Sequence, residues 1–473
     1  MQGMNTLALR VPNGPEICFD RRLIEHYGGR GPRYTSYPTA LQFSDEVNAD
    51  GYRRNALASN ASAAPLSLYV HIPFCRSLCY YCGCNKVVTR NQTRVKRYLD
   101  RLHRELRMQG ELFSHERKVE QVHFGGGTPT YLDARQLNAL MADLRGAFSF
   151  DDSDEREFSI EIDPRTVDGE RIRELWGLGF NRLSLGIQDF DPVVQKAVNR
   201  TQPTAKILRL LVDARRAGFE SISFDLIYGL PFQTIDSFDR TLDLVIGMQP
   251  DRLAVYNYAH LPQRFKGQRM IDEAALPQAA LKLEILHRTI DRLGDAGYVY
   301  IGMDHFALPG DALVRARLAG SLQRNFQGYS THGDCDLVGL GASAISRVGN
   351  VYAQNAVTTA VYETLIGNGQ LAIQKGIVVD SDDRLRAAVI QVLMCHDRLS
   401  FDTFEARHGV NFARYFKREL ERLQPLVRDG LTIVDRDGIL ITPKGRLLLR
   451  SIAMIFDRYI ETELAETRFS KAI

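Results

Sequence analysis

The sequence predicts an α/β fold built around a parallel sheet, because short apolar runs alternate with amphipathic segments from Leu66 onward. This alternation is typical of repeated strand–helix units. The segments 95–113 and 137–148 carry apolar residues at helical spacing. Six such units fit either an open doubly wound sheet or a partial barrel. The runs predicted to be strands are 66–72, 119–125, 158–163, 182–187, 221–227 and 252–258.

A polar or glycine-containing segment follows each predicted strand. Parallel strands end at one edge of their sheet, and loops at that edge carry the chemistry in both open sheets and barrels. We therefore expect one functional site there. The segments are 75–84, GGGTP (125–129), Asp163-Pro164, Gln188-Asp189, YGLP (228–231) and AHLP (259–262).

The flanking segments show other patterns. Residues 1–65 are irregular and rich in Gly and Pro at 28–40, whereas 358–369 and 383–395 have helical spacing. The tail 418–456 predicts a helix, a hairpin turning at Asp437-Gly438, and a second helix. This order is similar to a winged-helix domain, but no strongly basic helix supports DNA binding. We predict an N-terminal lid (1–65), a catalytic core (66–265), a core-completing segment that contributes substrate-site elements (266–355) and a mainly helical C-terminal domain (356–473).

The composition is that of an ordinary globular protein. The chain has 473 residues, of which 44% are hydrophobic and 25% charged, and this composition excludes disordered, collagen-like and fibrous classes. The net charge of +3 gives no global field that would indicate nucleic acid or a membrane surface as a partner. No apolar run is long enough to span a bilayer, and the N-terminus lacks a signal-peptide pattern. These features predict a cytoplasmic protein.

Four of the seven cysteines fall within ten residues, in HIPFCRSLCYYCGCNK. Three of them have the spacing C-x3-C-x2-C, and one loop with three thiols differs from the two separated pairs of most structural zinc sites. Three thiolates can ligate three irons of a cubane and leave its fourth iron open to a small molecule. Cys84 follows Cys82 too closely in the chain to ligate an iron at another corner of the same cubane. A zinc-stabilised interaction protein is the alternative, and Cys18, Cys335 and Cys395 are predicted bystanders.

This spacing resembles the radical S-adenosylmethionine superfamily. Further motifs make the chain similar to the oxygen-independent coproporphyrinogen III oxidase family over essentially its whole length. A shorter paralogous group of haem chaperones shares the cysteine loop but typically lacks Cys84 and the RYTSYP segment, and a haem-binding protein without the enzymatic step is the second hypothesis. The motifs are RYTSYP (33–38), FGGGTPTYL (124–132), EIDP (161–164), DLIYGLP (225–231), NYAHLP (257–262), IGMDHFA (301–307) and NFQGY (325–329), with RFSKAI at the end.

The resemblance implies a partial (β/α)6 barrel of the TIM type and a [4Fe–4S] cluster held by Cys75, Cys79 and Cys82. It also implies two S-adenosylmethionine molecules in one site. Gln327 and Ile345 would line the second of these molecules or the substrate. The implied reaction converts the propionates on rings A and B of coproporphyrinogen III to vinyl groups in haem biosynthesis. A flavodoxin or ferredoxin system as electron donor and a monomeric state are implied as well.

The same resemblance assigns roles to single residues, each of which has a plainer explanation. A strand-end acid such as Glu161 commonly forms an ion pair or caps a helix. A glycine run is often only a tight turn, and Arg200 could be an ordinary surface residue. Arg33, Tyr34 and Tyr37 would fold over the site, although such a stretch is more often a packed loop. His71 and His305 are expected to be hydrogen-bonded structural residues. The implied catalytic residues are Glu161, Tyr34 and Gln327, and the implied cofactor-binding residues are Tyr69, Tyr81, Gly126, Gly127, Thr128, Glu161, Gln188, Arg200, Asp225, Ala259 and Ile345.

Overall fold

Six parallel strands form the centre of one large sheet, and each agrees with a predicted apolar run to within one residue at either end. In the computed structural model, which describes residues 17–460, these six strands are neighbours in the order β9-β8-β7-β6-β4-β1. The prediction of a parallel α/β core is confirmed. Their bounds are β1 Leu66–Ile72, β4 Lys118–Gly126, β6 Glu157–Ile162, β7 Arg182–Gln188, β8 Ser221–Tyr228 and β9 Arg252–Asn257.

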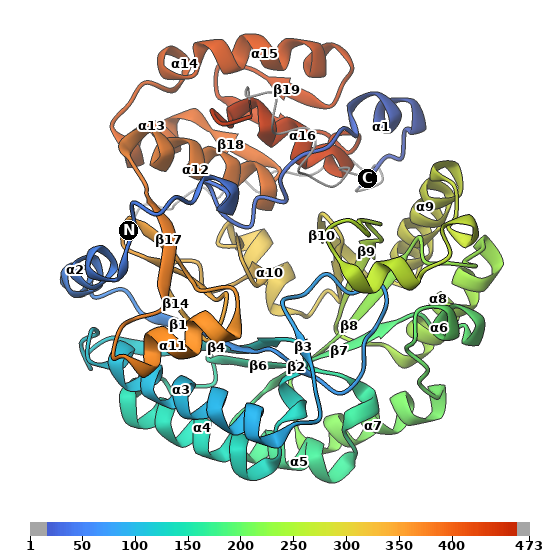
Figure 1. Ribbon diagram of the computed structural model, residues 1–473. Coiled ribbons are helices and arrows are strands. Elements are labelled where there is room, and N and C mark those ends of the chain that lie inside the picture. Colours follow the sequence, from blue (N-terminus) through green and yellow to red (C-terminus); the bar gives the residue numbers. More distant parts are fainter. Residues whose placement is uncertain (1–16, 461–473) are drawn as a thin grey trace, which may run out of the picture.

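The sheet continues at both sides of the six strands. β14 (Asp336–Leu340) pairs with β1 in parallel, and β15 (Ile345–Val348), β16 (Val351–Asn355) and β17 (Ile373–Val378) follow as antiparallel strands. At the other side, β11 (His305–Ala307) and β10 (Val299–Gly302) add an antiparallel hairpin to β9. Within residues 17–460 the strand order therefore has two ends. Figure 1 shows this sheet curving around an open centre, as expected of a partial barrel.

Helices cover the outer face of the curved sheet (Figure 1). α3 shows why they form there: Asn91 caps its first turn, and Val95, Leu99, Leu102 and Leu106 form the buried stripe that packs toward the strands. The outer helices are α3 Gln92–Gly110, α4 Ala134–Ala147, α5 Gly169–Gly177, α6 Pro192–Ala197, α7 Thr204–Ala217, α8 Ile235–Met248 and α9 Ala279–Asp295.

The C-terminal part forms a separate layer above the sheet in Figure 1. The predicted helix–hairpin–helix tail is confirmed, because α15 precedes the hairpin β19–β20, and the turn lies at Asp435–Gly438. Within residues 17–460 no helix is both long and apolar enough to cross a bilayer. α11 (Thr359–Gly367) instead packs against α3 beside the sheet (Figure 1). The elements of the C-terminal layer are α12 Ser381–Cys395, β18 Arg398–Ser400, α13 Phe401–His408, α14 Phe412–Tyr415, α15 Lys417–Arg428, β19 Thr432–Val434, β20 Gly438–Ile441 and α16 Leu449–Ala453.

The N-terminal segment is shared between two cores: Leu23, Tyr34 and Tyr37 pack with the C-terminal layer, whereas Tyr52 and Ala56 of α2 (Ala49–Ser59) pack with the large sheet. Besides α1 (Arg21–Tyr27) and α2, it contains the RYTSYP stretch, whose Tyr34 and Tyr37 are buried with the apolar residues of α12 to α16. Tyr34 donates a hydrogen bond to Asp457 (3.0 Å), and Arg450 Nε donates one to the carbonyl of Pro32 (3.0 Å). The two ends of the chain are therefore joined above the sheet. The RFSKAI motif lies outside the described residues.

Glu105 on α3 is a fully buried carboxyl that joins three elements. It accepts hydrogen bonds from Tyr362 on α11 (2.6 Å), from Asn355 on β16 (2.6 Å) and from the amide of Gly341 (2.7 Å). Burial raises its pKa to about 7, although these donors act in the opposite direction. This carboxyl therefore binds a proton in the folded state at pH values where the unfolded chain has lost it.

The free energy of unfolding should therefore carry a term from Glu105 that is fully present below pH 4.5 and lost as the pH rises through about 7. We expect Glu105→Gln to remove this term, so that the difference between variant and wild type shifts in favour of the variant by on the order of 3 kcal/mol between pH 5 and pH 8. Urea unfolding at both pH values measures it, and an unchanged difference would contradict the assignment.

Candidate functional site

A cavity of about 300 Å³ opens at the C-terminal ends of the central strands. Its wall comes from the cysteine loop and from the ends of β4, β6, β7, β8 and β9, so four of the six predicted strand-end segments (75–84, 125–129, Asp163-Pro164 and Gln188-Asp189) contribute to it. The other two, 228–231 and 259–262, are not part of the lining, and β8 and β9 contribute Asp225 and Tyr256 instead. Most of the predicted site residues lie in this wall. The lining includes Cys75, Cys79, Tyr81, Cys82, Cys84, Lys86, Gly126, Gly127, Thr128, Glu161, Asp163, Arg165, Ser184, Gly186, Gln188, Arg200, Asp225 and Tyr256.

Two arginines point at one thiol of the cysteine loop. Arg165 Nη2 and Arg200 Nη1 lie 3.2 Å and 3.3 Å from Cys79 Sγ. Asp163 pairs with both guanidinium groups, at 2.7 Å and 3.4 Å. The three charged groups leave one net positive charge beside the sulfur.

The other thiols of the loop differ in their surroundings. Burial raises the pKa of Cys75 to about 11, although Thr128 Oγ1 lies 3.4 Å from its sulfur. The hydrogen bond from Cys84 lowers the pKa of Cys82, aided by the positive charge of Lys86. Lys86 also donates to the Cys82 carbonyl (2.9 Å). Within residues 17–460 no three His, Cys, Asp or Glu side chains surround a point suited to a single metal ion.

The glycine run at the end of β4 is required by close packing. Gly126 has φ +113°, and a Cβ there would lie 2.5 Å from Cε1 of His71. A Cβ on Gly127 would lie 2.7 Å from the carbonyl of Pro73, and one on Gly125 would lie 2.9 Å from Glu161 Oε1. Only glycine leaves the backbone this near to the cysteine loop and to the wall of the cavity.

Two carboxyl groups of the cavity wall, Glu161 and Asp225, have pKa values shifted in opposite directions. Burial alone would raise the pKa of Glu161, but hydrogen bonds from His123 (3.3 Å) and from the amide of Gly126 (3.1 Å) lower it below the usual value. Burial raises the pKa of Asp225 to about 7, and the charge of Glu161 adds to the shift, while Ser184 donates a hydrogen bond (3.1 Å). Near pH 7 the site therefore holds one carboxylate and one carboxyl that titrates.

A bulge at the end of β7 places two further groups in the cavity wall. The pairing register with β8 shifts between Gly186 and Gln188, and Gln188 adopts φ +67°. Arg200 is buried, and its Nε and Nη2 donate to the Gly186 carbonyl at 3.2 Å and 2.6 Å. The plainer reading of Arg200 as a surface residue is therefore wrong. The bulge is a local rearrangement that re-aims a side chain at a strand end.

Five predicted residues lie outside the lining of this cavity. Tyr69 is held in β1, with its hydroxyl 3.0 Å from His71 Nδ1, and the Ala259 carbonyl accepts from Gln268 (3.2 Å). Tyr34 points toward the C-terminal layer, where its hydroxyl donates a hydrogen bond to Asp457. Ile345 packs beside Phe43 and Tyr352, and Gln327 has a buried amide nitrogen without a hydrogen-bond partner in the described part of the chain. The structure places these residues around the main cavity rather than in it.

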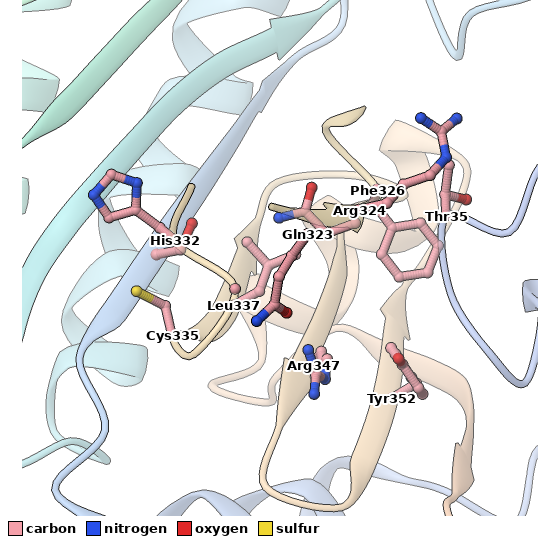
Figure 2. Close-up of a pocket in the computed structure, with 12 residues that line it drawn as sticks. Thr35, Gln323, Arg324, Phe326, His332, Cys335, Leu337, Arg347 and Tyr352 are labelled. Carbon is pink, nitrogen blue, oxygen red and sulfur yellow. The ribbon is translucent and has the colours of Figure 1, made fainter. Parts of the chain in front are cut away.

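A second cavity lies next to this outer group, near the hairpin of β12 (Gln323–Asn325) and β13 (Gly328–Ser330). Its volume is about 20 Å³, which suits a single water molecule rather than a cofactor. Figure 2 shows Gln323 and Arg347 facing this space, whereas the Arg324 guanidinium projects away from it past Thr35. The larger cavity is therefore the candidate active site.

The expectations for the remaining histidines and cysteines are mostly confirmed. His71 is hydrogen-bonded at both ring nitrogens, to Tyr69 and to the Asn85 carbonyl (3.0 Å each). His305 instead lies edge-on to Tyr256 and Tyr329, and its Nδ1 has no partner among residues 17–460. That expectation was wrong at this atom. Cys335 and Cys395 are buried as predicted.

Sequence reasoning missed Arg165 and Tyr256 as parts of the site. Arg165 follows directly after the strand-end Asp163-Pro164, so its place in the chain was a usable signal. Tyr256 belongs to β9 and reads as a strand aromatic, yet it lines the cavity while Arg33 of the N-terminal segment lies 5.6 Å from its ring centre. Because Arg33 and Tyr256 are far apart in the chain, no local sequence pattern indicates this contact.

Comparison with known proteins adds independent findings. The family model of the Radical SAM superfamily matches residues 69–245, and that of the HemN C-terminal domain matches 379–448. The chain is 52% identical to the oxygen-independent coproporphyrinogen III oxidase of Pseudomonas aeruginosa, covering 97% of this chain and 99% of that one. The counterpart of Escherichia coli is 48% identical with the same coverage. The solved structure of coproporphyrinogen III oxidase (HemN) from Escherichia coli, described as a Radical SAM enzyme, superposes with a TM-score of 0.90 over 94% of this chain and 100% of that one.

The glycine geometry gives a direct test. We expect Gly126→Ala to destabilise the fold by about 1–3 kcal/mol, because the new Cβ combines a left-handed backbone with the contact to His71. Gly146→Ala is the matched control, since nothing lies within 4 Å of its Cβ position in α4, and a helical alanine should be neutral or slightly stabilising. Thermal unfolding measures both, and equal melting temperatures for the two variants would refute the packing argument.

Proposed function

Because the chain belongs to the oxygen-independent coproporphyrinogen III oxidase family of the radical S-adenosylmethionine superfamily, we propose that it converts two propionates of coproporphyrinogen III to vinyl groups, giving protoporphyrinogen IX. Each conversion removes a β-hydrogen atom, then CO₂ and one electron, which passes to a one-electron acceptor. The observation that carries the proposal is the convergence of three loop thiols with the strand-end carboxylates and arginines on one cavity. The alternative of a haem-binding protein without this activity has no observation in its favour.

The residues of the cysteine loop fit an iron–sulfur cluster. Cys75, Cys79 and Cys82 line the same cavity, and two guanidinium groups lie against Cys79. A cubane binds each thiolate at its own iron, so the thiols need not meet at one point as they would around zinc. A bound [4Fe–4S] cluster would supply the electron for reductive cleavage of S-adenosylmethionine, and the 5′-deoxyadenosyl radical so formed would take up the hydrogen atom. The chain's own part is to hold the thiolates and to keep their charge compensated.

The polar wall of the cavity would bind the S-adenosylmethionine that meets the cluster. The bare backbone at Gly126, Gly127 and Thr128 allows the amino-acid end of that molecule to approach closely. Glu161 is ionised and suits its ammonium group, while Arg200 suits a carboxylate. Gln188, Asp225 and Tyr81 complete the wall and are proposed to orient the nucleoside, and Tyr69 supports it from β1.

A second S-adenosylmethionine and the substrate are proposed to lie farther out, toward the N-terminal segment. Gln327 there has an unpartnered buried amide nitrogen, and Arg324 has an unpartnered buried Nη1 within the described residues. Both are donors that a carboxylate would satisfy. Ile345 and Ala259 would provide packing and backbone contacts. Tyr34 is proposed to act by fixing the lid over the substrate, since its hydroxyl bonds Asp457.

Two further proposals concern partners. The electron that starts each cycle would come from a flavodoxin or ferredoxin system, because the cluster is reduced one electron at a time. The family resemblance supports a monomer and a cytoplasmic setting.

An anaerobic assay tests the proposed function. After reconstitution with iron and sulfide, the protein with S-adenosylmethionine, coproporphyrinogen III and dithionite should form protoporphyrin after oxidation, and Cys75→Ala should reduce turnover below detection. Cys18→Ala is the control, because that thiol lies outside the cavity, and it should retain wild-type turnover. A preparation without a four-iron chromophore, or full activity in Cys75→Ala, would sink the proposal. Stoichiometric haem binding without turnover would favour the alternative.

The raised pKa of Asp225 predicts how S-adenosylmethionine binding depends on pH. The ionised carboxylate accepts hydrogen bonds from ligand hydroxyls, so binding should tighten as the pH rises through about 7 and level off above it. Asp225→Asn should weaken binding by about tenfold at pH 8 and abolish this dependence. Equilibrium dialysis of the reconstituted protein between pH 6 and pH 8.5 measures both effects. An identical pH profile in the variant would assign the titration to another group.

A further inference from the structure

Six basic side chains surround the cysteine loop without acidic partners. No Asp or Glu occurs between His71 and Leu99 or between Arg252 and Ile271. In the described part of the chain none of the six forms an ion pair, and five of them are exposed while Lys86 is half-buried. We refer to this set as the basic rim: Arg76, Lys86, Arg90, Arg264, Lys266 and Arg269.

Contacts between the two segments place the residues of the basic rim around the cysteine loop. A Cβ on Gly83 would lie 3.1 Å from the Phe265 ring, so the segment after β9 rests against the cysteine loop. Gln268 Nε2 donates to the Tyr81 carbonyl (2.9 Å). On the other side, β2 (Phe74–Cys75) pairs with β3 (Val87–Val88), which places Arg90 just beyond the strand bonded to Cys75.

Two nearby acidic groups are already paired with other residues, and the exposed Asp272, which follows Ile271, accepts a hydrogen bond from the Ala274 amide (3.0 Å). Asp163 is engaged with Arg165 and Arg200 at the cavity wall. Glu273, beyond the end of the second segment, has its carboxylate 3.0 Å from His260 Nε2. A chain whose net charge is only +3 thus concentrates six positive charges beside its three predicted iron ligands.

We propose that the basic rim is the docking surface for an acidic protein that carries one electron at a time. This inference rests on the proposed function, because the electron is delivered to the cluster. Electron transfer slows steeply with distance, so a carrier must dock where the loop meets solvent, and Arg76, Ser77 and Gly83 are exposed there. Each docking passes one electron to the cluster per S-adenosylmethionine cleaved, and the carrier leaves oxidised by one electron. Opposite charges steer such encounters.

Charge reversal tests the proposal with two electron sources. The rim variant carries Arg90→Glu, Arg264→Glu and Lys266→Glu, none of which lines the cavity. The control carries Arg173→Glu, Arg209→Glu and Arg216→Glu on the exposed faces of α5 and α7, and it changes the net charge equally. Turnover of each reconstituted protein is measured with NADPH, flavodoxin reductase and flavodoxin, and separately with dithionite.

We expect the rim variant to raise the KM for flavodoxin by on the order of tenfold and to lose most of the ionic-strength dependence of kcat/KM. Its dithionite-driven turnover should stay within about twofold of wild type, as should both activities of the control. A wild-type KM in the rim variant, or an equal loss in the control, would overturn the docking surface. So would an equal loss with both electron sources.

Should the triple variant fold poorly, Arg264→Gln with Lys266→Gln must show the same selective effect in milder form. Failure of the wild type with dithionite would instead overturn the proposed function, and the docking surface with it.

Discussion

The parallel pairing of β1, β4, β6, β7, β8 and β9 is the constraint on which the site depends. Residues paired across these strands share a face, and the register sets Glu161 opposite Ser184, and Gly186 opposite Asp225. A slip of β6 by one residue would turn Glu161 toward the helices and put an isoleucine, Ile160 or Ile162, in its position. The apolar outer positions packed by α3 to α8 resist such a slip. The burial of apolar side chains on the outer face of the sheet therefore fixes the positions of the polar groups on its inner face.

Charge compensation is the second requirement, because the cavity is partly closed to water and opposite charges interact strongly there. Asp163 lies between Arg165 and Arg200, and both guanidinium groups reach Cys79. This arrangement places positive charge where thiolates would gather negative charge. Glu161 and Asp225 are close enough to repel each other, which helps to keep one of them protonated near neutral pH. The wall is thus adjusted to a ligand that carries both an ammonium and a carboxylate.

The sequence was a good guide wherever the determinants are local. Apolar runs located all six strands, and the expected site at their C-terminal ends agrees with the cavity that Gln188 lines. Glu161 and Asp225 lie within predicted strands, so the family resemblance, and not their position in the chain, assigned them to the site. Whether a single residue is exposed or buried was harder to predict. Arg200 was hard to distinguish from a surface residue because its partners, Gly186, Asp163 and Cys79, lie on other elements. The orientation of Tyr34 toward Asp457 depends on a contact across more than 400 positions of the chain. The inward face of Tyr256 depends on strand register rather than on composition.

The cover above the sheet follows from a contact between the two ends of the chain. Tyr34 and Tyr37 are buried with the C-terminal helices, and Arg450 bonds the carbonyl of Pro32, so neither the N-terminal segment nor the C-terminal layer would bury its apolar surface alone. Arg33 of the same segment reaches down to Tyr256 in the cavity wall and pairs with Asp304 beside β11. Arg33 therefore links the N-terminal segment, which packs on the C-terminal layer, to the cavity wall. Because exposure of a radical to water invites side reactions, a cover that contacts both the cavity wall and the C-terminal layer suits the proposed reaction.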